Sequence, residues 1–354
     1  MKEKIMIDLR SDTITRPTEA MQEAMLQAMR NPQLGDDTLA GDPLVRELEL
    51  VAAALAGKED GLLVCSGVMG NLVATLSHAP AGGEIVVDAQ SHMARSEMGG
   101  MSRLAGLYAI PIASADGKMD MNLLQAALRA NYDRSGTPTA LVCLESSHNH
   151  SGGCVPGLDY LRSVALMAAD KGIAVHLDGA RVFNAAISLG VPLCDIACHV
   201  DSLMLCLSKG LSAPMGSLLL GSREFIARAR VFRRMVGGGL RQSGIIAAAG
   251  LVALNTMVER LADDHRNARL LWEGWRGIDP ALVDTTPPAS NIVHLRVQRT
   301  VLPLAVDWQA RLEQQGVMML ATGHHHLRAV LHRHIRESDI PEAVAAVRRI
   351  SESV

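Results

Sequence analysis

The stretch CLSKGLSAPMGS, residues 206–217, places a lysine directly after a short apolar run. The residues Leu203–Leu207 are apolar at successive positions, a pattern typical of a strand that is buried on both faces of a parallel sheet. Lys209 therefore lies at the carboxyl end of that strand, the edge at which open α/β sheets bind ligands. Because burying an ammonium group is costly, a lysine here is either paired with an acid or used as a neutral amine of lowered pKa, the form that makes Schiff bases.

The composition indicates an ordinary soluble enzyme with room for one large domain and a smaller one. Of 354 residues, 48% are hydrophobic and 20% charged, and the net charge of -3 gives no reason to expect nucleic acid or an anionic membrane as a partner. The start MKEKIMIDLRSDT has no apolar core of signal-peptide length, and the longest apolar stretch, 245–254, is too short to span a bilayer. We therefore expect a cytoplasmic protein without a membrane partner.

The cysteines are scattered, which favours reduced core thiols over a disulfide framework. They are Cys65, Cys143, Cys154, Cys194, Cys198 and Cys206. The pair Cys194 and Cys198 could be half of a metal site, but a second spaced pair is missing from the sequence.

Between about residues 50 and 220, helical periods alternate with short apolar runs, which predicts a mainly parallel sheet with helices on both faces. The candidate strands are Leu62–Cys65, Ile85–Val87, Leu107–Pro111, Leu141–Leu144, Ile173–Leu177 and Leu203–Leu207, with Leu218–Leu220 added as an edge strand. A long helical region follows Arg241 and runs towards Trp272. After Pro287 and Pro288 the order strand, helix, strand, strand, helix predicts a small α+β domain. We thus expect a large domain over 1–255, with an N-terminal arm of about 1–45, and a small domain over 256–354.

A second signal is AVHLDGAR, residues 174–181, where Asp178 follows an apolar strand and falls at the same sheet edge as Lys209. Arg181 could pair with this carboxylate and make the arrangement merely structural. A pyridoxal phosphate site offers a better use, because it needs a lysine for the Schiff base and a carboxylate against the pyridinium nitrogen. The spacing of 31 residues leaves room for one crossover helix between the two strands.

A third signal is CSGVMGN, residues 65–71, where a strand turns through Ser66 and Gly67 into a helix. Free backbone N–H groups and the helix dipole would face a phosphate at such a turn. The stretch matches neither a Walker motif nor a GxGxxG fingerprint. A phosphate site and a simple tight turn therefore both remain open.

Taken together, these pieces resemble the aromatic amino acid beta-eliminating lyase/threonine aldolase family of fold-type-I pyridoxal phosphate enzymes. The resemblance covers nearly the whole chain and follows the family's order, in IDLRSDTITRPT, GDDTLAGDP, CSGVMGN, QSHMARSEMGG, CLESSHNHSGG, LDGARVFNAA, CLSKGLSAPMGS and RRMVGGGLRQSG. It implies an α/β, aspartate aminotransferase-like fold, with a mainly parallel seven-stranded sheet in the large domain and a small α+β C-terminal domain.

The resemblance also implies roles for single residues around the cofactor. Lys209 would form the Schiff base, Asp178 would face the pyridine nitrogen, and His92 would stack on the ring. The phosphate would be held at the turn formed by Ser66, Gly67 and Val68. Without the resemblance, a lone histidine such as His92 would be interpreted as a core or surface residue.

Three further positions would bind the substrate's α-carboxylate, namely Ser11, Arg181 and Arg328, and the arginines suit a bidentate grip. Arg181 would also lie against the cofactor. Arg241, in GGGLRQ, would reach the phosphate of a neighbouring subunit, which implies a homodimer or homotetramer with active sites at the dimer interface. By themselves these arginines would be interpreted as surface or salt-bridge residues.

The implied activity is the cleavage of an L-β-hydroxy-α-amino acid, such as threonine or allo-threonine, to glycine and an aldehyde. His92 or an ordered water would act as the base that removes the β-hydroxyl proton. One alternative keeps the cofactor but eliminates the β-substituent, which releases a keto acid and ammonia. A more distant alternative is a non-enzymatic metal-binding protein that uses His324–His326 with His332 and His334. We expect no metal and interpret that run as a polar strand lining the cleft.

The sequence departs from the family's pattern at several positions. Val68 stands where the phosphate turn commonly has threonine, so we expect weaker cofactor binding. Leu39, in the segment 36–40, replaces a tyrosine of the substrate pocket. The segment 93–97 has no aromatic residue before Glu97, and a further family histidine has no counterpart around 135–139. These changes bear on the identity of the substrate more than on the use of the cofactor.

Overall fold

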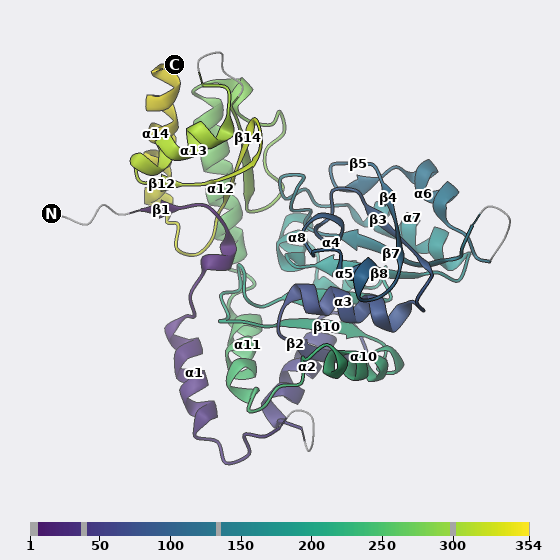
Figure 1. The fold of residues 1–354 in the computed structure, drawn as a ribbon. Coiled ribbons are helices and arrows are strands. Elements are labelled where there is room, and N and C mark those ends of the chain that lie inside the picture. The colour runs from purple at the N-terminus through teal and green to yellow at the C-terminus, as the bar shows by residue number, and fades with distance from the viewer. Residues whose placement is uncertain (1–5, 37–40, 132–135, 298–301, 354) are drawn as a thin grey trace. The chain divides into compact units, whose positions relative to one another are not determined.

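A computed structural model describes residues 6–36, 41–131, 136–297 and 302–353 (Figure 1). The chain separates into two compact units. One, here the sheet unit, comprises Arg16–Ser151 and Val155–Val258; the other, here the C-terminal unit, comprises Met1–Thr15, Gly152–Cys154 and Glu259–Val354. Residues 6–15 therefore belong with the C-terminal unit, whereas the sequence analysis expects an N-terminal arm of the large domain.

The sheet unit is built on a seven-stranded sheet in the order β2-β10-β9-β8-β7-β3-β4. Its strands are β2 (Asp60–Val64), β3 (Glu84–Asp88), β4 (Tyr108–Ile112), β7 (Thr139–Glu145), β8 (Ala174–Gly179), β9 (Ser202–Cys206) and β10 (Ser217–Gly221). The strands from β9 to β4 run parallel, and β10 is antiparallel to both of its neighbours. All seven predicted apolar runs are strands, and the mainly parallel sheet is confirmed.

The expected edge position of Leu218–Leu220 is wrong, because β10 lies between β2 and β9. All three leucines are fully buried. A strand that is apolar on both faces suits the interior of a sheet, since exposed edges favour short or charged strands. The edges of this sheet are β2 and β4 instead.

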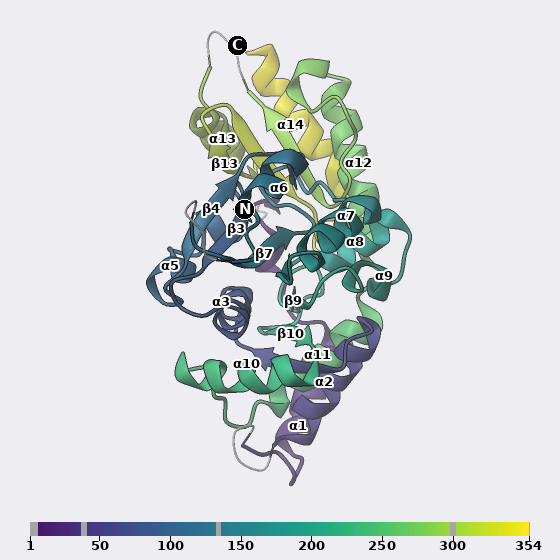
Figure 2. The same cartoon turned by 90° about the vertical axis from the view of Figure 1, so that its right-hand side faces the viewer.

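Helices cover both faces of the sheet. On one face, Leu62, Val64 and Leu219 pack with α3 (Gly67–His78) and α10 (Arg223–Met235). Residues alternate along a strand, so Leu63 points to the opposite face, where α2 (Pro43–Leu55) and α11 (Gly244–Thr256) lie beside α1 (Glu19–Met29) (Figure 2). The remaining elements of this unit are α4 (His92–Arg95), α5 (Gly100–Arg103), β5 (Ser114–Ala115), β6 (Lys118–Met119), α6 (Met121–Ala127), α7 (Leu158–Ala169), α8 (Val182–Leu189) and α9 (Leu193–Ala197).

The C-terminal unit has the predicted α+β composition. Its sheets are the antiparallel set β11 (Ile292–Arg296), β14 (His326–Val330) and β13 (Leu320–Gly323), and the parallel pair β1 (Ile7–Asp8) and β12 (Val317–Met318). Its helices are α12 (Leu261–Arg276), α13 (Ala305–Gln314) and α14 (Ile340–Glu352), with short 3-10 turns at Asp12–Ile14, Pro280–Leu282 and Glu337–Asp339.

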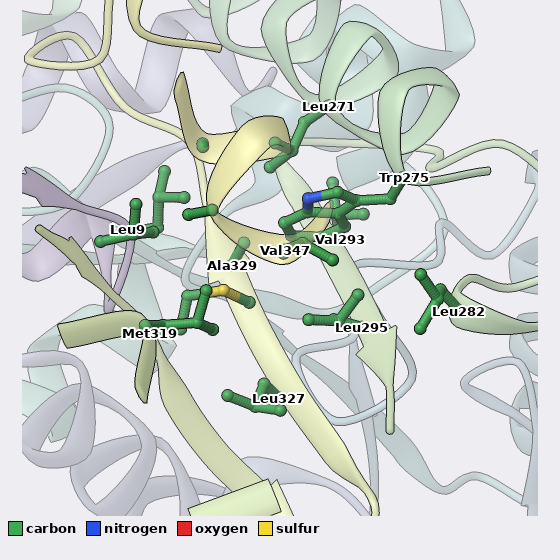
Figure 3. Close-up of a cluster of buried hydrophobic side chains, with 14 of the residues drawn as sticks. Leu9, Leu271, Trp275, Leu282, Val293, Leu295, Met319, Leu327, Ala329 and Val347 are labelled. Carbon is green, nitrogen blue, oxygen red and sulfur yellow. The ribbon is translucent and has the colours of Figure 1, made fainter. Parts of the chain in front are cut away.

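The core of this unit explains why the N-terminal segment belongs to it. Leu9 is fully buried in the cluster that contains Trp275 and Met319 (Figure 3). The backbone N–H of Leu9 donates to the carbonyl of Met318 at 2.8 Å, and the Leu9 carbonyl accepts from the N–H of Val330 at 2.8 Å. The segment is thus joined to this unit by backbone hydrogen bonds and by a buried side chain.

The helical region predicted beyond Arg241 consists of two helices, α11 and α12. The division between the two units falls at Glu259, in the segment that joins them. In the described part of the chain, no single helix has the length and apolar character needed to cross a membrane. Helices α11 and α12 reach that length and apolar character only when they are taken together, and the chain bends between them.

Candidate active site

Lys209 and Asp178 lie at the carboxyl ends of adjacent parallel strands. Strands β8 and β9 pair with Asp178 opposite Met204, and Lys209 follows the end of β9 by three residues. Asp178 is 2% exposed. Lys209 is half-buried, not buried as expected from the sequence, because it lies in the turn beyond the strand. This turn is closed by backbone hydrogen bonds from Ser212 to Lys209 and from Ala213 to Leu207, of 2.8 and 3.0 Å.

The Asp178 carboxylate accepts hydrogen bonds on both oxygens. The backbone N–H of Ala180 donates to Oδ1 at 3.1 Å, and Nδ2 of Asn71, from α3, donates to Oδ2 at 2.9 Å. A buried carboxylate needs such donors, because its charge is otherwise poorly solvated.

His92 begins the short helix α4, and its ring contacts a buried acid. Nδ1 of His92 lies 2.9 Å from Oε1 of Glu97. This hydrogen bond raises the pKa of His92, and the charge of Asp178 raises it further, whereas burial and the positive charge of Lys209 act in the opposite direction. Burial raises the pKa of Glu97.

Two separate parts of the chain supply three polar side chains to the site, those of His92, Glu97 and Asp178. One side-chain nitrogen or oxygen atom of each lies within 4.8 Å of those of the other two. Asn71 accounts for this spacing, since its amide donates to both acids.

Glu145, the last residue of β7, holds the backbone on two sides of the site. Its Oε2 accepts the N–H of His92 at 2.6 Å, and its Oε1 accepts the N–H of Asn149 at 2.8 Å. The side chain of Asn149 in turn accepts a hydrogen bond of 3.4 Å from Nη1 of Arg181, which is 7% exposed. Burial raises the pKa of Glu145, as does the nearby charge of Asp178. One carboxylate thus positions both His92 and the partner of Arg181.

The turn from β2 into α3 has the geometry of a capped helix start. Ser66 is the N-cap, and its Oγ accepts the N–H of Met69 at 3.2 Å. The first α-helical bond of this helix runs from the N–H of Gly70 to the carbonyl of Ser66, so the N–H groups of Gly67 and Val68 precede it. A Cβ on Gly67 would come within 3.0 Å of the Cys206 Sγ atom, so the helix start packs closely on the sheet.

Of the departures from the family pattern, Val68 lies in the first turn of α3 and is 42% exposed. Leu39 and the other residues of 37–40 lie outside the described residues, as do 132–135.

The other predicted site residues belong to other elements of the two units. Arg241 is 57% exposed on its side chain and forms an ion pair with Asp36 at 2.9 Å. In the C-terminal unit, Ser11 caps the turn Asp12–Ile14, and Arg328 of β14 donates to the carbonyl of Arg10 at 3.3 Å. Ser11 and Arg328 therefore lie close together within that unit. Their binding of a substrate carboxylate remains a prediction.

The histidine run His324–His326 does not form a strand of alternating histidines. Only His326 belongs to β14, while His324 and His325 lie in the turn between β13 and β14. The Nδ1 atom of His325 contacts the Pro303 carbonyl at 2.7 Å, and His332 is buried with its Nε2 atom 2.8 Å from the carbonyl of Asp8. These contacts give the histidines structural partners within the C-terminal unit.

Four residues that surround the site were missed by the sequence analysis. They are Asn71, Glu97, Glu145 and His176. Glu145 carried a usable signal, since it ends an apolar strand as Asp178 does, and the two are register partners in β7 and β8. Asn71, Glu97 and His176 stand in the quoted motifs CSGVMGN, QSHMARSEMGG and AVHLDGAR, but nothing in those motifs gives them a role, and only the fold shows that they are buried and hydrogen-bonded.

Comparison with known proteins decides the family. The profile of the family described as beta-eliminating lyase matches residues 8–298. This chain belongs to that family. Among its relatives, the probable low-specificity L-threonine aldolase 2 of Arabidopsis thaliana is 38% identical over 98% of both chains. The low specificity L-threonine aldolase of Escherichia coli K12 is 42% identical over 82% of this chain and 85% of its own.

Solved structures show the same fold for this beta-eliminating lyase family member. A threonine aldolase of Leishmania major superposes with a TM-score of 0.83 at 17% identity, covering 97% of this chain and 99% of its own. A serine palmitoyltransferase of Sphingomonas wittichii gives a TM-score of 0.79 at 17% identity, over 98% of this chain and 88% of its own. The predicted family, the lyase class and the fold class are confirmed.

Proposed function

We propose that this protein is a pyridoxal phosphate-dependent aldolase that cleaves an L-β-hydroxy-α-amino acid, such as threonine or allo-threonine, to glycine and an aldehyde. The observation that carries the proposal is the juxtaposition of Lys209 and Asp178 at the ends of adjacent parallel strands, with His92 beside Asp178. Relatives named low-specificity L-threonine aldolase, which match most of the chain, support the same activity.

The side chains present suit pyridoxal phosphate. Lys209 offers an amine, Asp178 offers a buried carboxylate for the ring nitrogen, and the N–H groups of Gly67 and Val68 at the start of α3 offer donors for the phosphate. When bound, the cofactor supplies an electron sink for the pair of electrons left on the α-carbon as the bond to the β-carbon breaks. We assign the Schiff-base role to Lys209 and the ring-stacking role to His92.

His92 is placed to accept the proton of the substrate's β-hydroxyl. Because Nδ1 contacts the Glu97 carboxylate, the neutral ring carries its proton on Nδ1 and leaves Nε2 as the acceptor. The raised pKa of His92 makes it a stronger base, but it must be deprotonated to act. Activity should therefore rise as the pH rises through that pKa.

Arg181 is suited to bind the substrate's α-carboxylate. It lies at the N-cap of α8, directly after β8, and is nearly fully buried. Its contact with Asn149 holds the guanidinium group on one side, and guanidinium groups bind carboxylates with two parallel hydrogen bonds. Glu145 supports this grip through Asn149.

We further propose a cytoplasmic homodimer or homotetramer in which Arg241 reaches the phosphate of a neighbouring site. The exposed Arg241 side chain is held by Asp36 rather than covered within its own chain. Leu26 and Met29 are 46% and 52% exposed on α1, as apolar side chains that a subunit contact would cover. In the described part of the chain none of the cysteines forms a disulfide, which is consistent with a reducing compartment.

The family's description favours one second candidate, the elimination of a β-substituent. The same residues would serve if the substrate carried a leaving group on its β-carbon. The products then differ, because elimination releases ammonia and a keto acid in place of glycine and an aldehyde.

Product analysis tests the proposal. Purified protein is incubated with pyridoxal phosphate and either L-threonine or L-allo-threonine, and glycine, acetaldehyde and ammonia are measured. We expect glycine and acetaldehyde in equal amounts, loss of activity in Lys209→Ala, and retained activity in the control Lys171→Ala. Ammonia with a keto acid would establish the elimination, and the absence of any product from either amino acid would overturn the proposal.

A further inference from the structure

Asn71 lies between the two acids of the candidate site. It is 1% exposed on α3, and its Nδ2 atom lies 2.8 Å from Oε1 of Glu97 and 2.9 Å from Oδ2 of Asp178. An amide nitrogen carries two hydrogens, so each acid receives one. The amide oxygen must then find its own donor on the other side.

That donor belongs to a chain of buried groups that fixes the amide in one orientation. Oδ1 of Asn71 lies 3.1 Å from Nε2 of His176, which is fully buried on β8. Nδ1 of His176 lies 2.8 Å from Oγ of Ser202, and the same Oγ lies 2.8 Å from Nε2 of His78.

The positions of the hydrogens along this series of hydrogen bonds follow from what each partner atom can donate or accept. An amide oxygen only accepts, so His176 carries its hydrogen on Nε2, and Nδ1 then accepts from the Ser202 hydroxyl. The oxygen of Ser202 is left to accept from His78. Burial lowers the pKa of His176 to about 3 and that of His78 to about 4, so both rings are neutral at ordinary pH.

We propose that Asn71 is a positioning residue of this site, which keeps Asp178 and Glu97 from sharing a proton by donating one hydrogen to each, in an orientation imposed by His176, Ser202 and His78. Two carboxyl groups this close would otherwise lower their repulsion by holding one proton between them. With Asn71 in place, both acids act as acceptors. Asp178 then faces the cofactor as a carboxylate, and Glu97 remains the acceptor for His92.

The charged groups around His92 determine what a change at Asn71 does. They are Glu97 from its own segment, Asp178 from β8, Glu145 from β7 and Lys209 beyond β9. Replacing Asn71 by leucine removes both donated hydrogens without adding an acid, so Asp178 and Glu97 are left to hold one proton between them. The negative potential at His92 should then decrease.

The test compares three variants in two measurements. Asn71→Leu keeps the branched shape but removes the donor without adding a charge, Ser202→Ala removes only the support of His176, and Ser77→Ala is the control. Ser77 is buried on the same helix, and its Oγ donates to the carbonyl of Val73, outside the chain of groups. The measurements are the titration of His92 by NMR in the cofactor-free protein and the Kd of pyridoxal phosphate.

We expect the midpoint of the His92 titration to move to lower pH in Asn71→Leu, because the shared proton removes a negative charge that raises it, and the Kd of pyridoxal phosphate to rise by roughly 10- to 100-fold, the effect of losing a hydrogen bond to a charged acceptor. Ser202→Ala should move both quantities in the same direction by less, and Ser77→Ala should change neither. If both test variants lower only the melting temperature, as a merely structural asparagine would, the proposal is overturned.

The proposal rests on the proposed function for the meaning of the cofactor measurement, but not for the titration. If the unaltered protein does not bind pyridoxal phosphate, the proposed function fails while the His92 titration still decides the role of Asn71. A variant of Asn71 that does not fold leaves the Ser202→Ala comparison with Ser77→Ala to decide it.

Discussion

Replacing Glu145 by glutamine changes one oxygen of a buried carboxylate into an NH2 group. The carboxylate accepts two backbone N–H groups, from His92 and from Asn149, at 2.6 and 2.8 Å. Glutamine has a single acceptor oxygen, so one of these N–H groups must face a donor. The loss of one hydrogen bond to a charged acceptor costs about 1.5–3 kcal/mol. Removing a buried charge, whose burial raises the pKa of Glu145, offsets part of that cost.

We therefore expect Glu145→Gln to lower the free energy of unfolding by only about 1 kcal/mol, since the two effects oppose each other. The effect on catalysis should be larger. The variant displaces either the backbone of His92 or the partner of Arg181, and a shift of about 1 Å in a positioned group can cost roughly 100-fold in rate. We expect kcat/KM with threonine to fall by roughly 10- to 100-fold, measured by coupled detection of acetaldehyde.

Glu84→Gln is the matched control, because Glu84 begins β3 at the opposite end of the sheet and pairs with Arg129 at 2.9 Å. It should reduce stability by a similar small amount and leave kcat/KM within about twofold of the unaltered protein. If Glu145→Gln also leaves kcat/KM within that range while denaturant unfolding shows the expected small loss, the carboxylate is structural only and the reasoning is refuted.

Three further predictions follow from single contacts. Glu97→Gln removes the group that contributes most to the raised pKa of His92, so the acidic limb of the plot of kcat against pH should move to lower pH. An acidic limb that stays or moves to higher pH would show that His92 is not the base. In Gly67→Ala, the added Cβ would lie 3.0 Å from the Cys206 Sγ atom, so the free energy of unfolding should fall by about 1–3 kcal/mol in urea, and an unchanged midpoint would refute the close packing. Burial raises the pKa of Asp264 from its ordinary 3.8 to about 6. Between these pH values the folded state holds a proton that the unfolded state releases, so the free energy of unfolding falls as the pH rises. Asp264→Asn should therefore flatten the dependence of the melting temperature on pH between these values, and an unchanged slope would contradict this.

Local sequence patterns predict most of the strands of the fold. The features that they do not predict depend on pairing between residues far apart in the sequence. Each strand of the large sheet appears in the sequence as a run of apolar residues, and the interior strands need no polar positions because they are buried on both faces. The order of strands is not local, so the apolar run Leu218–Leu220 suits an interior strand but does not show that β10 lies between β2 and β9. Likewise, Leu9 looks like any apolar residue near a terminus, and only the fold shows that it packs beside Trp275.

The site divides in the same way. Lys209 and Asp178 could be placed at the sheet edge because each follows an apolar strand. Asn71 and His176 could not, since a helix face and a strand interior bring them together from positions 105 residues apart. Their importance depends on burial and on hydrogen-bond partners, which a single sequence does not reveal.

The most direct test of the central claim is the location of the cofactor on the chain. Protein loaded with pyridoxal phosphate is reduced with borohydride, which makes the lysine link permanent, and its peptides are mapped by mass spectrometry. The account predicts the pyridoxyl group on the peptide that contains Lys209. A group found instead on Lys58, the half-buried lysine that donates to the Val200 carbonyl, or on no lysine at all, would contradict it.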